Sequence, residues 1–357
     1  MQQIRKNFGS DNVSPAHPAV MRALQAANQG TTGSYGADPW TQRAEALIAD
    51  LFGTDVAVFP VATGTAANAL ALSALAPPFG AVFCDEIAHI MNDEAGAPEF
   101  FSGGAKLLTL PSPDGRVDPG ALDEAIRRRR ISGVHQSPVA ALSITQATEW
   151  GTIYPVDHLR ALSEVARRHG LGVHMDGARF ANAVASLDAS PAELTWKAGV
   201  DVLSLGATKN GAFAAEAVVF FKPALAEEFA RRRKRAGHLF SKQRFLSAQL
   251  VGYLEDGLWL ANARAANRAA ARLAEGLAAL PGAALVQPVE ANELFVLLPE
   301  PVITALEGEG YVFYRWAPCP ERGGSIIRLV TAFDITDEDV DGLIATVRRS
   351  AGRNEGR

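Results

Sequence analysis

The stretch from Leu171 to Gly211 constrains the fold more than any other part of the chain. It contains two short apolar runs, the first followed by Asp176 and Arg179 and the second by Lys209. Continuous apolar runs of this length are typical of parallel strands buried between two layers of helices. Ligands of such sheets bind at the carboxyl ends of the strands. We therefore expect a carboxylate, a guanidinium and an amine to meet there, a set that suits an anionic, nitrogen-containing cofactor.

Strand and helix patterns alternate along most of the chain, which predicts an α/β domain with a mostly parallel sheet. The expected strands are residues 56–60, 81–84, 105–110, 140–144, 171–175, 201–205 and 217–221. The expected helices are residues 17–28, 44–52, 66–75, 118–130 and 156–169. A long helical region is predicted from Pro223 to Leu280, with bends at Gly252 and Gly257.

The length of 357 residues favours two domains over one core. After residue 284 the pattern becomes that of a compact α+β unit, with strands at 293–298, 311–314 and 326–331 and helices at 301–307 and 336–349. We expect an N-terminal arm (1–40) that is part of the large-domain unit, a large domain (41–250) and a small C-terminal domain (251–357).

Composition and charge exclude several classes of protein. The net charge of −5 gives no general attraction to nucleic acid or acidic membranes, and the basic clusters Arg127–Arg130 and Arg231–Arg235 are interpreted as solvated helix faces. The uncharged stretch Val56–Cys84 is interrupted by polar residues and prolines, so it does not predict a membrane span. Two distant cysteines fit a reducing compartment, and the first twelve residues do not resemble a signal peptide. A cytoplasmic protein without nucleic-acid or membrane partners is expected.

The turn Thr63–Asn68 joins an expected strand to an expected helix and is built of small residues. Free N–H groups at a helix N-terminus, approached closely across small residues, bind phosphate well. By itself the turn favours a tight turn with threonine caps and no ligand.

Asp176 and Lys209 sharpen the hypothesis. A carboxylate at the end of an apolar strand needs a partner, and a pyridinium nitrogen is one that it would keep protonated. Arg179 serves either a substrate carboxylate or an ion pair with Asp176, and the residues leave both open. Lys209 lies in a loop after the next strand, a setting in which lysines form Schiff bases. A phosphate-binding turn, a partner for a pyridinium nitrogen and an amine that can form an imine are together the groups expected around pyridoxal phosphate.

The histidines constrain the function less than Asp176 and Lys209 do. His89 follows a strand end and either stacks on a cofactor ring or bonds to its own loop. His174 lies within a strand and is interpreted as a packed core residue. No set of metal ligands is recognisable, so no metal site is expected.

These residues occur in an order that resembles the low-specificity L-threonine aldolases, pyridoxal-phosphate enzymes of the fold-type I superfamily. The resemblance covers nearly the whole chain. It rests on Ser10-Asp11-Asn12, Tyr35-Gly36-Ala37-Asp38, Thr63–Asn68, Ala88-His89, Glu94-Ala95-Gly96, His174–Arg179, Thr208–Gly211 and Ile327–Thr331.

The resemblance implies a fold-type I transferase-like architecture and a role for each matching residue. Lys209 would hold the cofactor as a Schiff base, Asp176 contact its pyridine nitrogen, and His89 cover its ring. The remaining matches place Gly64 and Thr65 on the phosphate, Ser10, Arg179 and Arg328 on the substrate carboxylate, and Tyr35 in the site of a neighbouring subunit.

Two departures from the family pattern stand out. Many threonine aldolases carry an Asn-Thr-His run where this chain has the segment Gln146–Trp150, which resembles the branch that includes phenylserine-active aldolases. The basic phosphate ligand also aligns poorly, with Lys242 the best candidate and Arg244 close to it. The base that takes the substrate hydroxyl proton is left open between His89, His135 and a water molecule.

The resemblance implies retro-aldol cleavage of L-threonine, L-allo-threonine and related L-β-hydroxy-α-amino acids, L-phenylserine among the candidates, to glycine and an aldehyde. The alternative is β-elimination or transamination on the same scaffold, and a non-catalytic binding protein is the third interpretation. A homodimer or homotetramer with shared active sites is expected.

Overall fold

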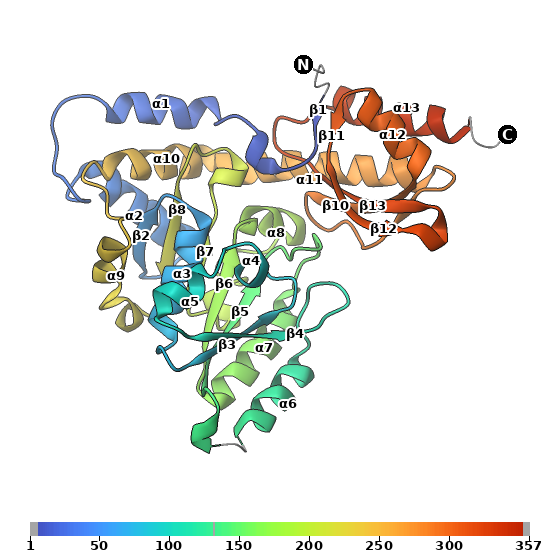
Figure 1. Ribbon diagram of the computed structural model, residues 1–357. Coiled ribbons are helices and arrows are strands. Elements are labelled where there is room, and N and C mark those ends of the chain that lie inside the picture. The colour runs from blue at the N-terminus through green and yellow to red at the C-terminus, as the bar shows by residue number, and fades with distance from the viewer. Residues whose placement is uncertain (1–5, 131–132, 353–357) are drawn as a thin grey trace.

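The computed structural model describes residues 6–130 and 133–352 (Figure 1), so the first and last five residues of the expected arm and C-terminal domain lie outside it. A central sheet of seven strands has the order β2-β8-β7-β6-β5-β3-β4. The strands are β2 (Ala57–Val61), β3 (Ala81–Asp85), β4 (Lys106–Leu110), β5 (Val139–Thr145), β6 (Gly172–Gly177), β7 (Val202–Leu205) and β8 (Glu216–Phe220). The predicted strands are confirmed, with ends that differ by one or two residues.

One strand runs against the others. β3 to β7 pair in parallel, whereas β8 pairs antiparallel with both β7 and β2. The sheet is therefore mostly parallel, as predicted. Because β8 is reversed, its first residue, Glu216, lies at the edge where β6 and β7 end.

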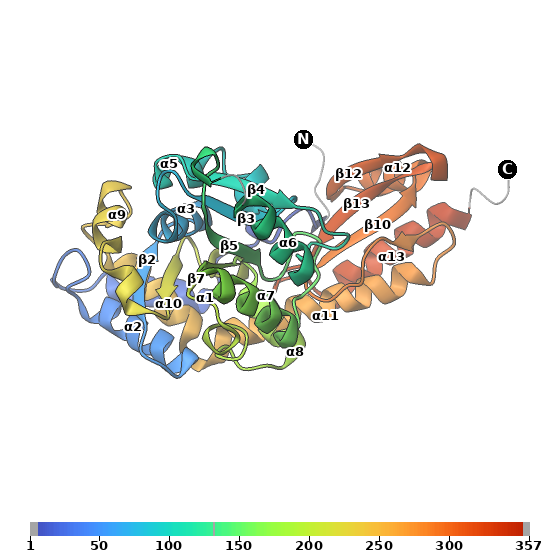
Figure 2. The same ribbon diagram turned by 90° about the horizontal axis from the view of Figure 1, so that it is seen from below.

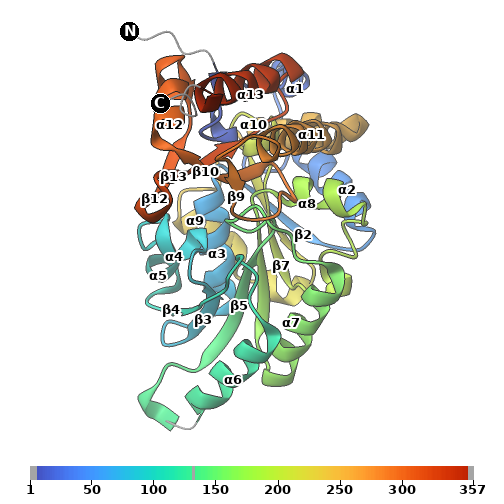
Figure 3. The ribbon, with the colours of Figure 1, turned by 90° about the vertical axis from the view of Figure 1, so that its right-hand side faces the viewer.

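Helices cover both faces of this sheet (Figure 3). α3 and α9 pack on one face, and α2, α6, α7, α8 and α10 share the larger core on the other. Their bounds are α2 (Pro39–Phe52), α3 (Gly64–Leu75), α6 (Pro119–Arg130), α7 (Val156–His169), α8 (Phe180–Leu187), α9 (Phe229–Arg235) and α10 (Arg244–Leu254). Two short helices, α4 (His89–Asn92) and α5 (Ala97–Ser102), follow β3 and were not predicted.

Local chemistry explains where two of these helices begin. Asp38 caps α2 by accepting a hydrogen bond from the Thr41 N–H at 2.9 Å, and Pro39 occupies the first turn, so α2 starts five residues before the predicted position. Thr63 caps α3 in the same way through the Ala66 N–H. Both caps use the oxygen of a short polar side chain to satisfy a helix-end donor.

The helical region expected between Pro223 and Leu280 is interrupted. Residues 236–243 separate α9 from α10. The next break lies at Gly257, which has a φ of +69° and directly precedes α11 (Leu258–Ala278). Gly252 is not a bend but lies inside α10. There a Cβ would come within 2.9 Å of the Ala23 side chain on α1 (Pro18–Ala27), so glycine permits close helix packing.

The C-terminal unit is a four-stranded sheet of order β12-β13-β10-β9, with α11 and α13 along one side (Figure 2). Its strands are β9 (Ala284–Leu285), β10 (Glu293–Pro299), β12 (Tyr314–Cys319) and β13 (Gly324–Val330), and its helices are α12 (Glu300–Gly308) and α13 (Asp337–Gly352). β12 and β9 were not predicted. The expected strand at 311–314 is divided, because β11 (Tyr311–Val312) instead pairs with β1 (Lys6–Asn7).

The boundary between the two hydrophobic cores lies within α11. Ala263 belongs to the core of the large sheet, and residues from Ala269 onward belong to that of the small sheet. Phe8, from the expected arm, also lies in the second core, whereas α1 packs on α10. The arm is thus shared between the two units. No helix among the described residues has the length and apolar character needed to cross a membrane.

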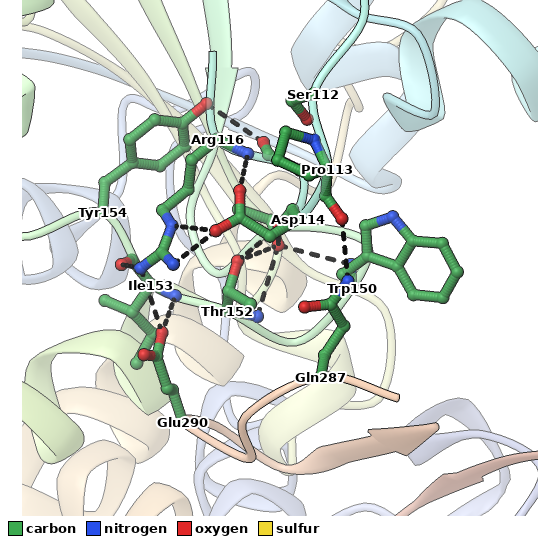
Figure 4. Close-up of polar contacts among 12 residues, drawn as sticks. Ser112, Pro113, Asp114, Arg116, Trp150, Thr152, Ile153, Tyr154, Gln287 and Glu290 are labelled. Carbon is green, nitrogen blue, oxygen red and sulfur yellow. Dashed lines mark hydrogen bonds and ion pairs between the residues drawn. The ribbon is translucent and has the colours of Figure 1, made fainter. Parts of the chain in front are cut away.

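A polar junction joins the units beside the large sheet (Figure 4). Glu290, in the segment before β10, accepts a hydrogen bond from the Ile153 N–H at 2.7 Å and lies 3.5 Å from an Arg116 nitrogen. Gln287 donates to the Pro113 carbonyl at 2.8 Å. The loops that follow β4 and β5 are thereby fastened to the C-terminal unit.

Candidate active site

A pocket of about 510 Å³ opens at the carboxyl ends of the parallel strands. The loops after β2, β3, β5, β6 and β7 and the start of β8 supply its lining, as the strand order requires. Its functional side chains come from Asn68, His89, Glu94, Glu149, Asp176, Lys209 and Glu216. Larger cavities lie elsewhere in the described chain and contain none of these groups.

The phosphate-type turn forms one wall of this pocket. Gly64 and Thr65 line it at the first turn of α3. The first N–H groups of a helix have no acceptor within the helix. An anion at this position would therefore meet free donors and the positive end of the helix dipole, as expected from the sequence.

Asp176 ends β6 with its carboxylate facing the pocket and is only 3% exposed. Its Oδ2 accepts from the Asn68 amide at 2.8 Å and its Oδ1 from the Ala178 N–H at 3.0 Å. Each oxygen keeps a lone pair for a further donor. The carboxylate can therefore hold a pyridinium N–H.

Lys209 enters from the loop after β7, on a short 3-10 turn. Within the described chain its amine makes no hydrogen bond or ion pair. Glu216 lies nearby, accepts from the Ala207 N–H at 2.7 Å, and has a pKa that burial raises to about 7. The amine is thus presented to the pocket with no direct ionic partner.

His89 is linked to Asp176 through two buried side chains. His89 Nδ1 lies 2.9 Å from Glu94 Oε1, and Asn68 Nδ2 donates to that same oxygen at 2.8 Å as well as to Asp176. The hydrogen bond with Glu94 raises the pKa of His89, although burial opposes this. The ring is oriented by a carboxylate and is available to cover a planar ligand.

Glu149 lines the same pocket from the loop after β5. Its carboxylate has no hydrogen-bond or ion-pair partner in the part of the chain that the structure describes. Burial raises its pKa to about 7, although Lys209 lowers it. It is a candidate for proton transfer near neutral pH.

Arg179 is occupied by two carboxylates. Its Nε and one terminal nitrogen bind the Asp11 carboxylate at 2.7 and 3.0 Å, and its other terminal nitrogen lies 3.0 Å from Glu293. Asp11 and Glu293 raise the pKa of Arg179 against the opposing effect of burial. The pairing partner left open by the sequence is therefore not Asp176 but these two residues, and Arg179 is absent from the pocket lining.

Arg328 is held more loosely. It reaches from β13, donates to the Gly9 carbonyl at 3.2 Å and lies 3.8 Å from Glu293. Its guanidinium is 4.8 Å from the centre of the Tyr314 ring and 5.6 Å from that of Trp316. A planar guanidinium stacked on aromatic rings keeps its edge available for a carboxylate.

Ser10 lies beside that position and caps the turn Asp11–Val13 by accepting from the Asn12 N–H at 3.1 Å. Its neighbour Asn12 lines the pocket. The structure thus brings the Ser10 segment and the pocket together.

Three further predicted residues, Tyr35, His135 and Lys242, are also absent from the pocket lining. Tyr35 is 48% exposed on the loop between α1 and α2. His135 precedes β5 and so lies at the opposite end of the sheet. Lys242 is exposed, and neighbouring Arg244 donates to the Gly30 carbonyl. Their predicted roles stay predictions.

Other basic groups approach the phosphate-type turn. Arg233 donates to the Pro60 carbonyl at 3.2 Å, and His238 Nδ1 accepts from the Ala62 N–H at 3.3 Å. Neither was proposed from the sequence, because both lie in a basic, helical-looking segment without a motif.

Several carboxylates also escaped the sequence analysis as functional residues, namely Asp11, Glu94, Glu149, Glu216 and Glu293. A signal did exist for Glu216 and Glu293, since each is a lone charge at the start of an apolar run. No sequence pattern shows that Glu94 faces His89, because this contact depends on the short helix α4, which begins at His89 and ends two residues before Glu94.

The donor set fits pyridoxal phosphate. A helix N-terminus for the phosphate, a hydrogen-bonded carboxylate for the pyridine nitrogen and an uncommitted amine lie around one cavity. The volume is in the usual range for small-molecule sites. These pocket residues therefore agree with the cofactor expected from the sequence.

Comparison with known proteins gives the family. A model of the beta-eliminating lyase family matches residues 7–301. A low specificity L-threonine aldolase of a Pseudomonas species is 46% identical over 96% of this chain and 97% of its own length. Another from Pseudomonas aeruginosa is 47% identical over 97% of this chain and 98% of its own. The chain belongs to the beta-eliminating lyases, in the branch of the low-specificity L-threonine aldolases.

A solved structure of a threonine aldolase from Leishmania major agrees with this family. It superposes with a TM-score of 0.90 at 29% identity and covers 96% of this chain and 98% of that one. The fold-type I architecture predicted from the sequence is confirmed.

Proposed function

We propose that this protein is a pyridoxal-phosphate aldehyde-lyase that cleaves L-threonine and related L-β-hydroxy-α-amino acids to glycine and an aldehyde. The observation that carries the proposal is the meeting of Lys209, Asp176 and the α3 N-terminus at one strand edge. The names of the two Pseudomonas relatives support the choice of reaction. L-allo-threonine and L-phenylserine belong to the same substrate class.

Bound pyridoxal phosphate supplies an imine-forming carbonyl and a ring that withdraws electrons from the substrate's Cα. Lys209 is the amine that holds the cofactor. Asp176 keeps the ring nitrogen protonated, because an ionised carboxylate at hydrogen-bond distance favours the charged form. Gly64 and Thr65 bind the phosphate, and His89 covers one face of the ring.

The substrate's carboxylate is assigned to Arg328, with Ser10 beside it. Fixing the carboxylate turns the substrate about Cα, so that the Cα–Cβ bond stands across the plane of the cofactor ring. Arg179 supports this clamp indirectly, because Glu293 lies between the two guanidinium groups.

We also propose a cytoplasmic homodimer or homotetramer in which Tyr35 completes the site of a neighbouring subunit. Tyr35, Phe213 and Phe240 are 48%, 66% and 39% exposed. The Tyr35 N–H bonds to the Ser241 carbonyl just before α10, and the Phe213 N–H bonds to Gln249 in the middle of that helix. The segments that carry the three side chains therefore meet around residues 240–249. Exposed apolar side chains gathered in this way are typical of an interface.

The test is Lys209→Ala, assayed with L-threonine and L-phenylserine for aldehyde and glycine. We expect turnover and the absorption band of the cofactor–lysine linkage to be lost. Lys106→Ala is the matched control, since Lys106 is an exposed lysine on β4 far from the pocket.

The products decide between reactions. Release of a keto acid in place of glycine and aldehyde would move the chemistry to β-elimination or transamination. A coloured, active Lys209→Ala protein would refute the assignment of the amine.

A further inference from the structure

Glu149 lines the active-site pocket and has no hydrogen-bond or ion-pair partner for its carboxylate among the described residues. The buried pocket carboxylates are committed: Glu94 to His89 and Asn68, Asp176 to Asn68, and Glu216 to a backbone N–H. In the described part of the chain, Glu149 has no such bond, and it lines the pocket. Its side chain is partly exposed, so its carboxylate can meet a bound substrate directly.

The backbone around Glu149 is a rigid turn. The Gly151 N–H bonds to the Thr148 carbonyl at 2.9 Å, which makes Glu149 the second residue of a β-turn. Thr148 Oγ1 accepts from the N–H groups of Trp150 and Thr152 at 3.3 and 3.2 Å. A reactive group is held accurately when its backbone is fixed in this way.

The next residue anchors the turn to the C-terminal unit. The Trp150 ring packs edge-on against Phe295, with centres 4.6 Å apart, and against Trp316 at 5.8 Å. Trp316 is also stacked near the Arg328 guanidinium. The position of Glu149 is thereby linked to that of the residue assigned to the substrate carboxylate.

The charges around Glu149 come from every side of the pocket. They are Lys209 after β7, Arg179 and Asp176 on and after β6, Glu293 on β10 and His89 on α4. Burial raises the pKa of Glu149 to about 7, and the two carboxylates add to this while the cations oppose it. Glu149 can therefore both accept and donate a proton near neutral pH.

Retro-aldol cleavage needs an acceptor for the proton of the β-hydroxyl group. The two histidines considered from the sequence fit this task poorly. The Nδ1 atom of His89 lies 2.9 Å from Glu94 Oε1 and is engaged there, and His135 lies at the opposite end of the sheet from the pocket.

We propose that Glu149 is the catalytic residue that takes the proton from the substrate's β-hydroxyl group. The hydroxyl proton passes to a Glu149 oxygen, and the O–H electron pair becomes the second C–O bond of the aldehyde. The Cα–Cβ bond breaks and its electron pair passes to Cα, where bound pyridoxal phosphate would delocalise it. Cα is then protonated to give glycine, so the reaction gains and loses no proton. This inference rests on the proposed function.

The decisive variant is Glu149→Gln, which keeps the size and the turn but removes the basic oxygen. We expect L-threonine cleavage to fall by about 10²-fold or more, the usual contribution of a general base. Glu164→Gln is the matched control, because Glu164 is an exposed glutamate on α7 outside this pocket.

Exchange of the α-proton of glycine in deuterated water separates the hydroxyl step from the rest. Glycine has no β-hydroxyl group, yet it needs Lys209, Asp176 and Arg328. We expect Glu149→Gln to retain this exchange within about threefold while cleavage collapses. Equal losses of both reactions, or unchanged cleavage, would overturn the proposal.

A third measurement does not depend on turnover. The infrared difference spectrum of the cofactor-free protein between acid and alkaline pH should contain a carboxyl band that titrates near pH 7 and disappears in Glu149→Gln. Because Glu216 has a similar pKa, Glu216→Gln is recorded alongside to assign its band. A spectrum unaltered by Glu149→Gln contradicts the proposal. If the unmodified enzyme releases no aldehyde, the proposed function fails instead.

Discussion

At the scale of single residues, the site depends on one shared amide. Asn68 uses its only NH₂ group for both Glu94 and Asp176, at 2.8 Å each. Glu94 in turn orients His89. His89 and Asp176, which we propose to cover the cofactor ring and to contact its nitrogen, are therefore parts of one hydrogen-bond chain.

Replacing Glu94 by glutamine should lower the pKa of His89. The variant keeps a hydrogen-bond acceptor but loses the charge that favours the imidazolium form. The stability that this proton provides is fully present below the pKa of an unfolded histidine, about 6.5, and is lost as the pH rises through the higher folded value. An NMR titration of the His89 ring measures the shift. The exposed Glu86→Gln serves as control, and an unaltered His89 titration in Glu94→Gln would falsify the coupling.

At the scale of elements, the loop after β5 does two things. Its first half presents Glu149 to the pocket, and its second half is fastened to the C-terminal unit through Ile153 and Glu290 (Figure 4). Gly151 joins the halves with a φ of +74°, and a Cβ there would come within 2.9 Å of the Glu293 carbonyl oxygen. Only glycine allows this close approach without displacement of β10.

Two substitutions at Glu290 should separate charge from hydrogen bonding. Glu290→Ala leaves the Ile153 N–H without its acceptor and should lower the free energy of unfolding by about 1–3 kcal/mol. Glu290→Gln keeps an acceptor and loses only the partly exposed ion pair with Arg116, which is worth about 1 kcal/mol or less. Urea unfolding of both variants measures the difference, and equal losses would show that the hydrogen bond does not matter.

At the scale of the whole molecule, Asp11, Arg179 and Glu293 tie three regions together. Asp11 comes from the N-terminal segment, Arg179 follows β6 of the large sheet, and Glu293 begins β10 of the small sheet. All three are buried. Loss of one partner from such a cluster leaves an uncompensated charge in the interior, which costs more than the pair itself contributes.

Asp11→Asn should therefore destabilise the protein by about 3 kcal/mol at neutral pH. Burial raises the pKa of Asp11, but Arg179 outweighs it and holds the pKa below its usual value. The stability due to ionised Asp11 is present above the unfolded pKa of about 3.9 and is lost as the pH falls through the folded value. Unfolding measured from pH 7 into acid should show the variant's deficit shrinking, while exposed Asp157→Asn shows none. A deficit independent of pH would contradict this account.

Local patterns were enough to predict the large sheet and the meeting of Asp176 and Lys209 at its strand ends. Apolar runs show β6 and β7, and Asp176 and Lys209 follow them directly in sequence. The role of Arg179 could not be predicted in the same way, because its partners Asp11 and Glu293 lie 168 and 114 positions away along the chain. The same holds for Glu94, whose direction depends on α4, a helix too short to leave a periodic pattern.

The pairing of β1 with β11 has a consequence for biosynthesis. Lys6 lies opposite Tyr311, and Phe8 packs into a core otherwise made of residues from Ala269 onward. A ribosome has therefore made the whole large sheet before the partners of this first strand exist. During that time the apolar Phe8 lacks its native core, so the nascent N-terminus keeps an apolar side chain exposed until synthesis has passed β11 and β13.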